Sequence, residues 1–192
     1  MTFGMYGVLF LLPLTWQSAG TLSAVHAGLA LMPMALVFVV LSPFSGWLRE
    51  RLGTRAVTAG GVAVIGLGLL TVELGANHQS IVFDEIGLVL AGLGMGIATG
   101  PLMAAAVGAV EPARSGTASA LINVARMAGA TIGVAMLGAV YVLAGGGADG
   151  LRLAMLLGGG AQIACAASAW LSMRERQDRH HSSERVTSYE ST

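Results

Sequence analysis

The chain has 192 residues, of which 55% are hydrophobic and 10% are charged, and its formal net charge at pH 7 is zero. Soluble domains carry about 25% charged residues, so this chain has too few to coat a water-soluble globule. The composition therefore excludes an ordinary soluble domain and indicates an integral membrane protein, with the lipid bilayer as its partner and no nucleic acid. The only cysteine, Cys165, lies in an apolar run, which excludes a disulfide framework.

Six apolar runs approach the length of about 20 residues that a helix needs to cross the hydrocarbon core of a bilayer. They cover residues 3–16, 25–47, 56–74, 86–110, 116–144 and 151–173. These runs predict an all-α fold, a polytopic membrane helix bundle of six transmembrane helices over residues 1–173. Residues 174–192 are polar and charged without an apolar period, and they predict a disordered tail.

The first run begins almost at Met1 and is short, about 24 Å as a helix. It lacks the basic N-terminal region of a signal peptide and contains Gly and Pro, which favours a first transmembrane helix over a cleaved leader. Its shortness predicts that the chain is a fragment of a longer protein. The second run contains Pro33 and Pro43, which a membrane helix tolerates where neighbouring helices or water satisfy the freed carbonyls.

The arginines predict how the six helices cross the membrane. Six crossings place both termini on one side, and that side receives Arg49, Arg51, Arg55, Arg114, Arg174, Arg176, Arg179 and Arg185. The opposite side receives only Arg152. Since an excess of basic residues marks the cytoplasmic side, we expect both termini in the cytoplasm and the bundle in the cell inner (plasma) membrane.

Glycines recur at the spacing that lets membrane helices approach closely. Gly92, Gly96 and Gly100 are four residues apart, and Gly129 and Gly133 repeat the interval. A chain with 28 glycines produces some such intervals by chance. Three in register in the fourth run favour a helix contact.

Arg126 is the clearest candidate for a transport role, because ionisable residues inside a membrane are rare and face protein or a water-filled cavity. It lies about 15 Å into the fifth run, and Asn123 shares its helix face. The alternative is that Arg126 reaches the headgroups or pairs structurally. For Gln17 the sequence favours an interfacial anchor and a cavity residue equally. Thr99 is expected either to bend its helix or to line the pathway.

The remaining ionisable residues predict neither an enzyme nor a metal centre. Asp84 and Glu85 begin the fourth run, where acids favour the helix N-terminus, so a cap is the expected role. Glu73 is expected at the membrane interface. His26 and His78 lack metal-ligand spacing with Cys or acids, and no Ser/His/Asp or Cys/His arrangement is present. We therefore expect no cofactor and no catalytic residue.

Residues 46–55, here called the switch segment, read G-W-L-R-E-R-L-G-T-R and form a charged island between two apolar runs. Gly46 and Gly53 permit a tight reversal between helices, so we expect a loop. Glu50 can pair with Arg51, Arg55 or a helix N-terminus, and such a pair can hold one conformation and release in another. The alternative is a segment that only sets the orientation in the membrane.

The switch segment resembles the signature G-x-L-x-D-R-x-G-x-R/K of the major facilitator superfamily, which lies between the second and third helices of each six-helix half. Here it follows the second run, with Glu50 where the family has Asp. Further stretches resemble the C-terminal half of the fourteen-helix drug:proton antiporters. They are Tyr6-Gly7, residues 10–14, Gln17, residues 27–29 and Pro33, then residues 91–96, Gly100-Pro101, residues 114–120 and residues 123–126.

The resemblance implies the major facilitator fold, in which two six-helix bundles rock about a central site. It implies efflux of amphipathic small molecules driven by protons. The chain resembles one bundle, so we expect an N-terminal six-helix bundle or a second copy as its partner. The alternatives are a non-transporting six-helix protein that binds or regulates a transporter, and a non-functional gene fragment.

Overall fold

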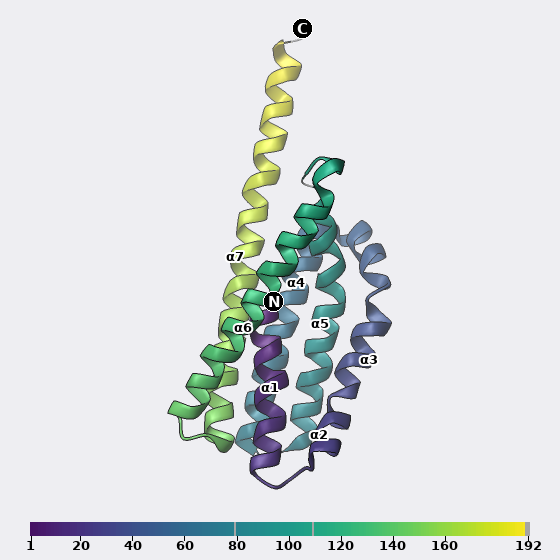
Figure 1. Cartoon of the computed structure of the whole chain (residues 1–192). Helices are drawn as coiled ribbons and strands as arrows, with labels where there is room; N and C mark the ends of the chain where they lie inside the picture. Colours follow the sequence, from purple (N-terminus) through teal and green to yellow (C-terminus); the bar gives the residue numbers. More distant parts are fainter. Residues whose placement is uncertain (79, 109, 191–192) are drawn as a thin grey trace.

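In the computed structural model the chain is a bundle of helices (Figure 1). The structure describes residues 1–190 except 79 and 109, and the side chains of 106, 112 and 172–190 lie outside the described set. The helices are α1 (Thr2–Ser18), α2 (Ala24–Ala30), α3 (Met32–Leu41), α4 (Phe44–His78), α5 (Ile81–Val107), the 3-10 turn η1 (Pro112–Arg114), α6 (Ser115–Leu143) and α7 (Gly147–Glu190). The described residues contain no strand, so the predicted all-α class is confirmed.

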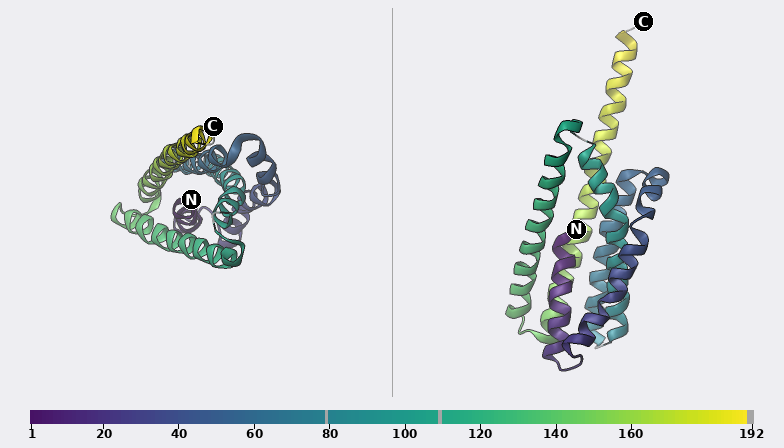
Figure 2. Two further views of the ribbon diagram at one scale, coloured as in Figure 1. Left: turned by 90° about the horizontal axis from the view of Figure 1, so that it is seen from above. Right: turned by 45° about the vertical axis from the view of Figure 1, so that its right-hand side comes forward.

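The long helices run side by side along one axis (Figures 1 and 2). Helix α4 packs between α5 and α7, α3 covers α5, and α1 packs mainly against α6. Seen from above, the N-terminus lies inside the ring of helices (Figure 2). The buried core contains Leu11 and Leu12 of α1, Ile65 and Leu69 of α4, and Leu88 of α5. The helix that begins the chain is therefore an interior element of the bundle.

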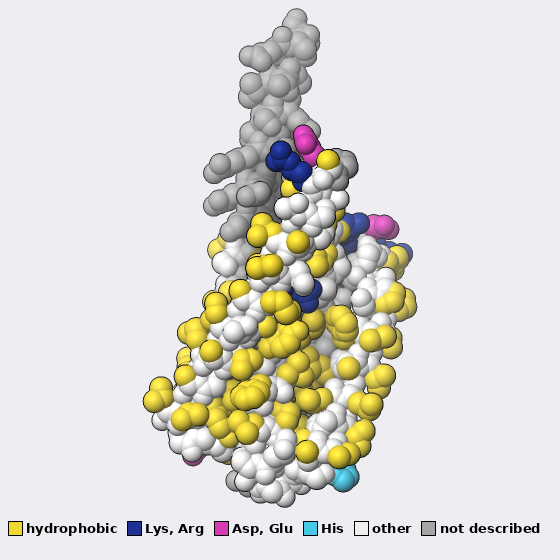
Figure 3. Space-filling model, in the orientation of Figure 1, with side chains coloured by type: hydrophobic (Ala, Val, Ile, Leu, Met, Phe, Trp, Pro, Cys, Tyr) yellow, Lys and Arg dark blue, Asp and Glu magenta, His cyan; other side chains and the backbone are white. Residues whose placement is uncertain are grey.

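Five segments are long and apolar enough to cross a membrane, among the residues that the structure describes. They are Ala24–Leu41, Phe44–His78, Ile81–Ala105, Ser115–Leu143 and Gly147–Leu171. Helix α1, with 17 residues, falls just short of this length. On the face in Figure 3, hydrophobic side chains are spread along the bundle, as a bilayer requires.

The second apolar run is not one continuous helix, which corrects the expected helix over residues 25–47. Helix α2 ends at Ala30 and α3 runs only from Met32 to Leu41. Pro33 lies in the first turn of α3, where its missing N–H is harmless, and Pro43 follows the end of α3. The two prolines thus mark helix boundaries in this span.

The switch segment is helical up to Gly53 rather than a loop. The expected end of the second helix at residue 47 is therefore wrong. Helix α4 begins at Phe44 and is interrupted at Gly53, whose φ of 81° and ψ of 152° are not helical. Only glycine adopts this conformation readily, so the chain turns there between a short arm and the long membrane arm. The reversal predicted for Gly53 is present, but Gly46 lies within the short helical arm.

The glycines lie where helices meet. Between α4 and α5, a Cβ on Gly61 would come within 2.7 Å of the Gly94 carbonyl oxygen, and one on Gly68 within 2.6 Å of that of Gly87. Of the glycines predicted to pack, Gly92 and Gly96 face α3, Gly100 faces Ser45, and Gly129 and Gly133 face the first turn of α1. Small residues thus bring α5 against two neighbours and α6 against α1.

The backbone of α7 is helical as far as Glu190. The sequence predicts an irregular tail from residue 174 onwards, where no side chain is described. The predicted disorder of residues 174–192 stays a prediction.

The α1–α6 contact gives a stability test with a matched control on one helix. A Cβ on Gly133 would overlap the backbone of Phe3, whereas a Cβ on Gly138 has no atom within 4 Å. Both Gly→Ala changes gain helix propensity equally. We expect Gly133→Ala to have a free energy of unfolding about 1–3 kcal/mol below that of Gly138→Ala, because the contact is overpacked. Denaturant unfolding in detergent, followed by helical circular dichroism, measures this difference. Equal stability of the two variants would contradict the packing.

Candidate functional site

Polar groups from three helices meet at the start of α1, and we call Met1, Thr2, Arg126 and Gln162 the polar seam. Gln162 of α7 is 1% exposed and its Nε2 donates to the Met1 carbonyl oxygen at 2.7 Å. Thr2 Oγ1 donates to the Arg126 carbonyl oxygen at 2.8 Å. Because unpaired polar groups are costly inside a bilayer, these bonds hold α1 between α6 and α7.

Arg126 brings a charge to this seam. Its side chain is half-buried, and its Nε atom is buried without a hydrogen-bond partner. Asn123, one turn earlier on α6, is exposed. An unpaired guanidinium donor at this depth is unfavourable unless water, an anion or another protein surface supplies a hydrogen-bond partner.

The other two pathway candidates lie elsewhere. Gln17 is exposed near the far end of α1, about 22 Å along the helix from Thr2. Thr99 is half-buried on α5, where its Oγ1 donates to the Met95 carbonyl oxygen at 2.8 Å. The structure therefore does not gather Arg126, Asn123, Gln17 and Thr99 into one site.

An open apolar groove of about 260 Å³ lies between α1, α3 and α5, and we call it the Met-rich groove. Its lining residues are all apolar: Met5, Leu9, Leu31, Met34, Ala35, Phe38 and Met95. Methionine side chains are flexible and polarisable, so a surface with three of them adapts to ligands of different shape. The sequence did not reveal this groove, because its residues come from three separate helices.

The switch segment places two guanidinium groups over tryptophan rings. Arg51 lies 4.2 Å from the ring centroid of Trp47, and Arg55 lies 4.1 Å from that of Trp170 on α7. The Nε and Nη2 atoms of Arg55 are buried without a hydrogen-bond partner. Glu50 is exposed and forms no ion pair with a described residue, so the pairing expected for it is absent here.

One ion pair is present among the described residues, at the opposite end of α4. Arg152 Nε of α7 lies 2.8 Å from Glu73 Oε1. The Arg152 side chain is 53% exposed, so the pair contributes little to stability but links α4 to α7. The single arginine expected on that side thus has an acidic partner, which the sequence did not predict.

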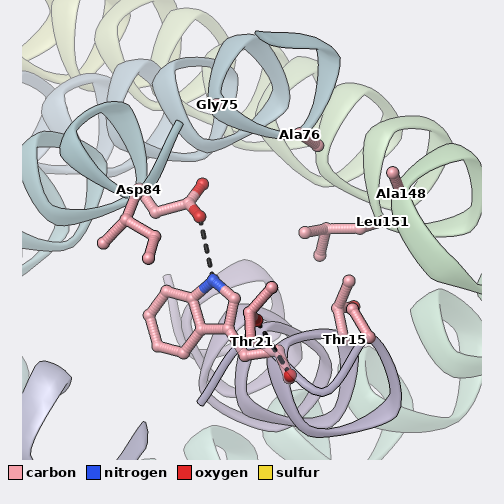
Figure 4. A pocket seen from close by; sticks show the side chains of 10 residues that line it. Thr15, Thr21, Gly75, Ala76, Asp84, Ala148 and Leu151 are labelled. Carbon is pink, nitrogen blue, oxygen red and sulfur yellow. Dashed lines mark hydrogen bonds between the residues drawn. The ribbon is translucent and has the colours of Figure 1, made fainter. Parts of the chain in front are cut away.

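Asp84 is buried rather than a helix cap, which corrects the sequence expectation. Its side chain is 5% exposed, its Oδ2 accepts a hydrogen bond from Trp16 Nε1 at 3.0 Å, and its Oδ1 is buried without a partner. It faces a cavity of about 360 Å³ at the ends of α1 and α4 and the beginnings of α5 and α7, here called the Asp84 pocket (Figure 4). The sequence feature that could have indicated a buried Asp84 is its position within an apolar helix rather than before it.

The Asp84 pocket and the switch segment lie at opposite ends of the bundle. Gly75, which lines the pocket, is 20 residues after Arg55 on α4, or about 30 Å. The α5–α6 connection lies at the same end as the start of α4 (Figure 1). Basic side chains gather toward that end on the face in Figure 3.

Comparison with known proteins identifies relatives over most of the chain. The family model described as Major Facilitator Superfamily matches residues 1–188. The multidrug resistance protein Stp of Mycobacterium tuberculosis is 33% identical over 138 residues, which are 72% of this chain and 26% of Stp. The multidrug resistance protein B homolog of the same organism is 30% identical over 71% of this chain and 26% of its own length. A triacylglyceride transporter of Mycobacteroides abscessus is 39% identical over 48% of this chain and 20% of its own length. The chain spans about a quarter of the length of these relatives.

The contact between Trp16 and Asp84 predicts a coupled pair. We expect Trp16→Phe to lower the free energy of unfolding by about 1–3 kcal/mol, because it leaves the buried carboxyl without its donor. The control Trp47→Phe, at an exposed ring, should change stability by less than about 0.5 kcal/mol. The Trp16→Phe loss should shrink in an Asp84→Leu background, as a denaturation cycle in detergent can measure. An undiminished loss there would show that the bond does not stabilise the fold.

Proposed function

Because the chain belongs to the Major Facilitator Superfamily, a family of membrane transporters and not of enzymes, we propose that it forms the C-terminal six-helix half of a proton-coupled multidrug efflux transporter. Two of its relatives are named multidrug resistance proteins. The family match confirms the membership that the switch segment suggested. Proton coupling, efflux and alternating access are proposed for this chain together with that function.

The observation that carries the multidrug proposal is the Met-rich groove. It offers amphipathic compounds an open, wholly apolar surface with three methionines and the ring of Phe38. Binding to such a surface depends on buried apolar area and adaptable packing rather than on fixed hydrogen bonds, which suits many chemically different substrates. Arg126 and the polar seam lie on the other side of α1 and would supply the charge that the groove lacks.

We propose that α1 also crosses the membrane and is the first of six transmembrane helices. The bundle then crosses the plasma membrane six times with both termini in the cytoplasm. The excess of arginine in the switch segment and the α5–α6 connection supports this orientation. The Asp84 pocket would then face the outside and the switch segment the cytoplasm.

A partner bundle would cover the helices that are least buried. In an apolar window of 18 residues within each candidate span, 11% of the residues are buried for Ala24–Leu41 and 17% for Ser115–Leu143, against 56% for Phe44–His78. Helix α6 also carries the unpaired Arg126 Nε and the exposed Asn123, which suit a water-filled cleft between bundles better than lipid. We propose that an N-terminal six-helix bundle, or a second copy, occupies this side and rocks against it in alternating access.

A chimera tests the function directly. The chain should replace the matching segment of Stp, and the chimera should be expressed in a bacterial strain without its own major exporters. We expect resistance to several amphipathic compounds, lost when a protonophore collapses the proton gradient, because the chimera restores two opposed bundles. The chain expressed alone should give no resistance. A correctly inserted chimera without resistance would favour a regulatory protein or a non-functional fragment.

Two substitutions in that chimera test the residues. Arg126→Ala should lower efflux about tenfold, the equivalent of one lost charge-assisted hydrogen bond. Its control, Met127→Ala, truncates an exposed neighbour on α6 and should leave efflux unchanged.

Glu50→Gln should reduce efflux more than membrane expression, with the exposed Glu111→Gln as its control. If efflux only followed expression in the Arg126 and Glu50 variants, neither residue would take part in transport.

A further inference from the structure

The Asp84 pocket has the chemistry of a cation site. We propose that it binds small organic cations, of the ammonium type with apolar substituents, as the outer binding site of the exported compound. This inference rests on the proposed export function and adds a binding site to it. The pocket is separate from the Met-rich groove, which is lined only by apolar residues of α1, α3 and α5 and the segment between α2 and α3.

The buried carboxyl is the first reason. Asp84 has one hydrogen bond, from Trp16, and its Oδ1 has no partner although it is buried against Gly75. An ionised carboxylate without a counter-charge is unfavourable in so dry a position. A cation that enters the pocket supplies the missing charge, so the site gains affinity for positive ligands from a group that the empty fold leaves unsatisfied.

No protein cation fills this place among the described residues. The nearby basic side chain of α7, Arg152, is held by Glu73 of α4 at 2.8 Å. His78, at the end of α4, lies against the ring of Phe83, with 6.0 Å between centroids. On α5 the neighbouring charge, Glu85, is also an acid. The electrostatic potential of the pocket is therefore set by carboxylates, which attract a positive ligand.

The walls of the pocket suit an ammonium with apolar groups. Its volume of about 360 Å³ falls at the lower end of the range of small-molecule sites. Trp16 contributes an aromatic ring beside the carboxyl, and Leu151, Ala76 and Ala148 contribute apolar surface (Figure 4). Aromatic rings are a recurrent means of binding quaternary ammonium groups.

Neighbouring hydrogen bonds hold the pocket wall in place. Thr21 Oγ1 donates to the Trp16 carbonyl oxygen at 2.9 Å, which fixes the turn that follows α1. Thr15 Oγ1 donates to the Leu11 carbonyl oxygen at 2.8 Å, and the Tyr141 hydroxyl accepts from Gly147 N at 2.9 Å. Both hydroxyls lie at the junction of α1, α6 and α7. The pocket is thus formed before a ligand arrives, which reduces the entropy lost on binding.

The test uses the tryptophan in the pocket as its reporter. The chain has three tryptophans, so Trp47→Phe and Trp170→Phe leave Trp16 as the only one. The full chain in lipid nanodiscs is titrated with benzyltrimethylammonium while Trp16 emission is recorded. We expect saturable quenching, with neopentylbenzene, the neutral molecule of the same shape, binding about tenfold more weakly because it lacks the charge.

Two substitutions identify the site. Asp84→Asn keeps an acceptor for Trp16 and should weaken binding about tenfold or more, whereas Glu85→Gln, the same charge change one residue away, should weaken it less than about threefold. Ala148→Leu should block the pocket without touching the carboxyl, and the exposed Ala167→Leu on the same helix should not. Helical circular dichroism of each variant confirms that it is folded.

Several outcomes would overturn the inference. Equal binding of the charged and neutral probes, or equal losses in Asp84→Asn and Glu85→Gln, would show that the carboxyl does not select cations. A Trp16 signal that responds to pH but not to benzyltrimethylammonium would make Asp84 a proton site instead. Because binding is measured on the isolated chain, a negative result here leaves the chimera's efflux, and with it the proposed function, as a separate result.

Discussion

The close approach of α4 and α5 is the constraint on which the rest of the bundle depends. Lipid tails are as apolar as leucine, so the hydrophobic effect does not drive helices together inside a bilayer, and close packing must do so. Gly61 against Gly94, and Gly68 against Gly87, bring the two backbones together at two levels. Around this pair, α3 packs on α5, α7 packs on α4, and α1 fills the interior against α6 and α7. The tightly packed side of the bundle can then move as one body, as the alternating access proposed for it requires.

The polar groups are placed at different depths of this apolar frame. The switch segment puts arginines over tryptophan rings at one end of α4, and the Asp84 pocket puts an unpaired carboxyl at the other. Arg126 lies between them on the sparsely buried α6. Unsatisfied charged or polar groups inside a membrane protein are unfavourable, and their presence at three separate depths is what a path for polar or cationic ligands needs. In the proposed transporter these groups find their partners when ligand, proton or the opposing bundle arrives.

Much of the fold could be predicted from apolar length alone, because the six runs correspond to helices or helix pairs of the bundle. The signature of the switch segment predicted the family that the comparison identified. Where the prediction was wrong, local chemistry decided: Pro33 and Pro43 divide the second span, and residues 46–52 are helical up to the break at Gly53. Asp84 was mistaken for a cap because sequence position cannot tell which face of a first helical turn is buried. The Met-rich groove and the Asp84 pocket combine residues from several helices. No local sequence pattern predicts which residues of different helices lie together.

The central claim is that the switch segment faces the cytoplasm and the Asp84 pocket faces outside, since both proposals need this sidedness. It is tested most directly by labelling single cysteines with a membrane-impermeant maleimide. In a Cys165→Ala background, Thr21→Cys at the rim of the pocket and Arg114→Cys in the α5–α6 connection place one thiol at each end. We predict that Thr21→Cys is labelled in intact cells and that Arg114→Cys is labelled only after the cells are permeabilised. The reverse pattern, or labelling of both in intact cells, would contradict the account.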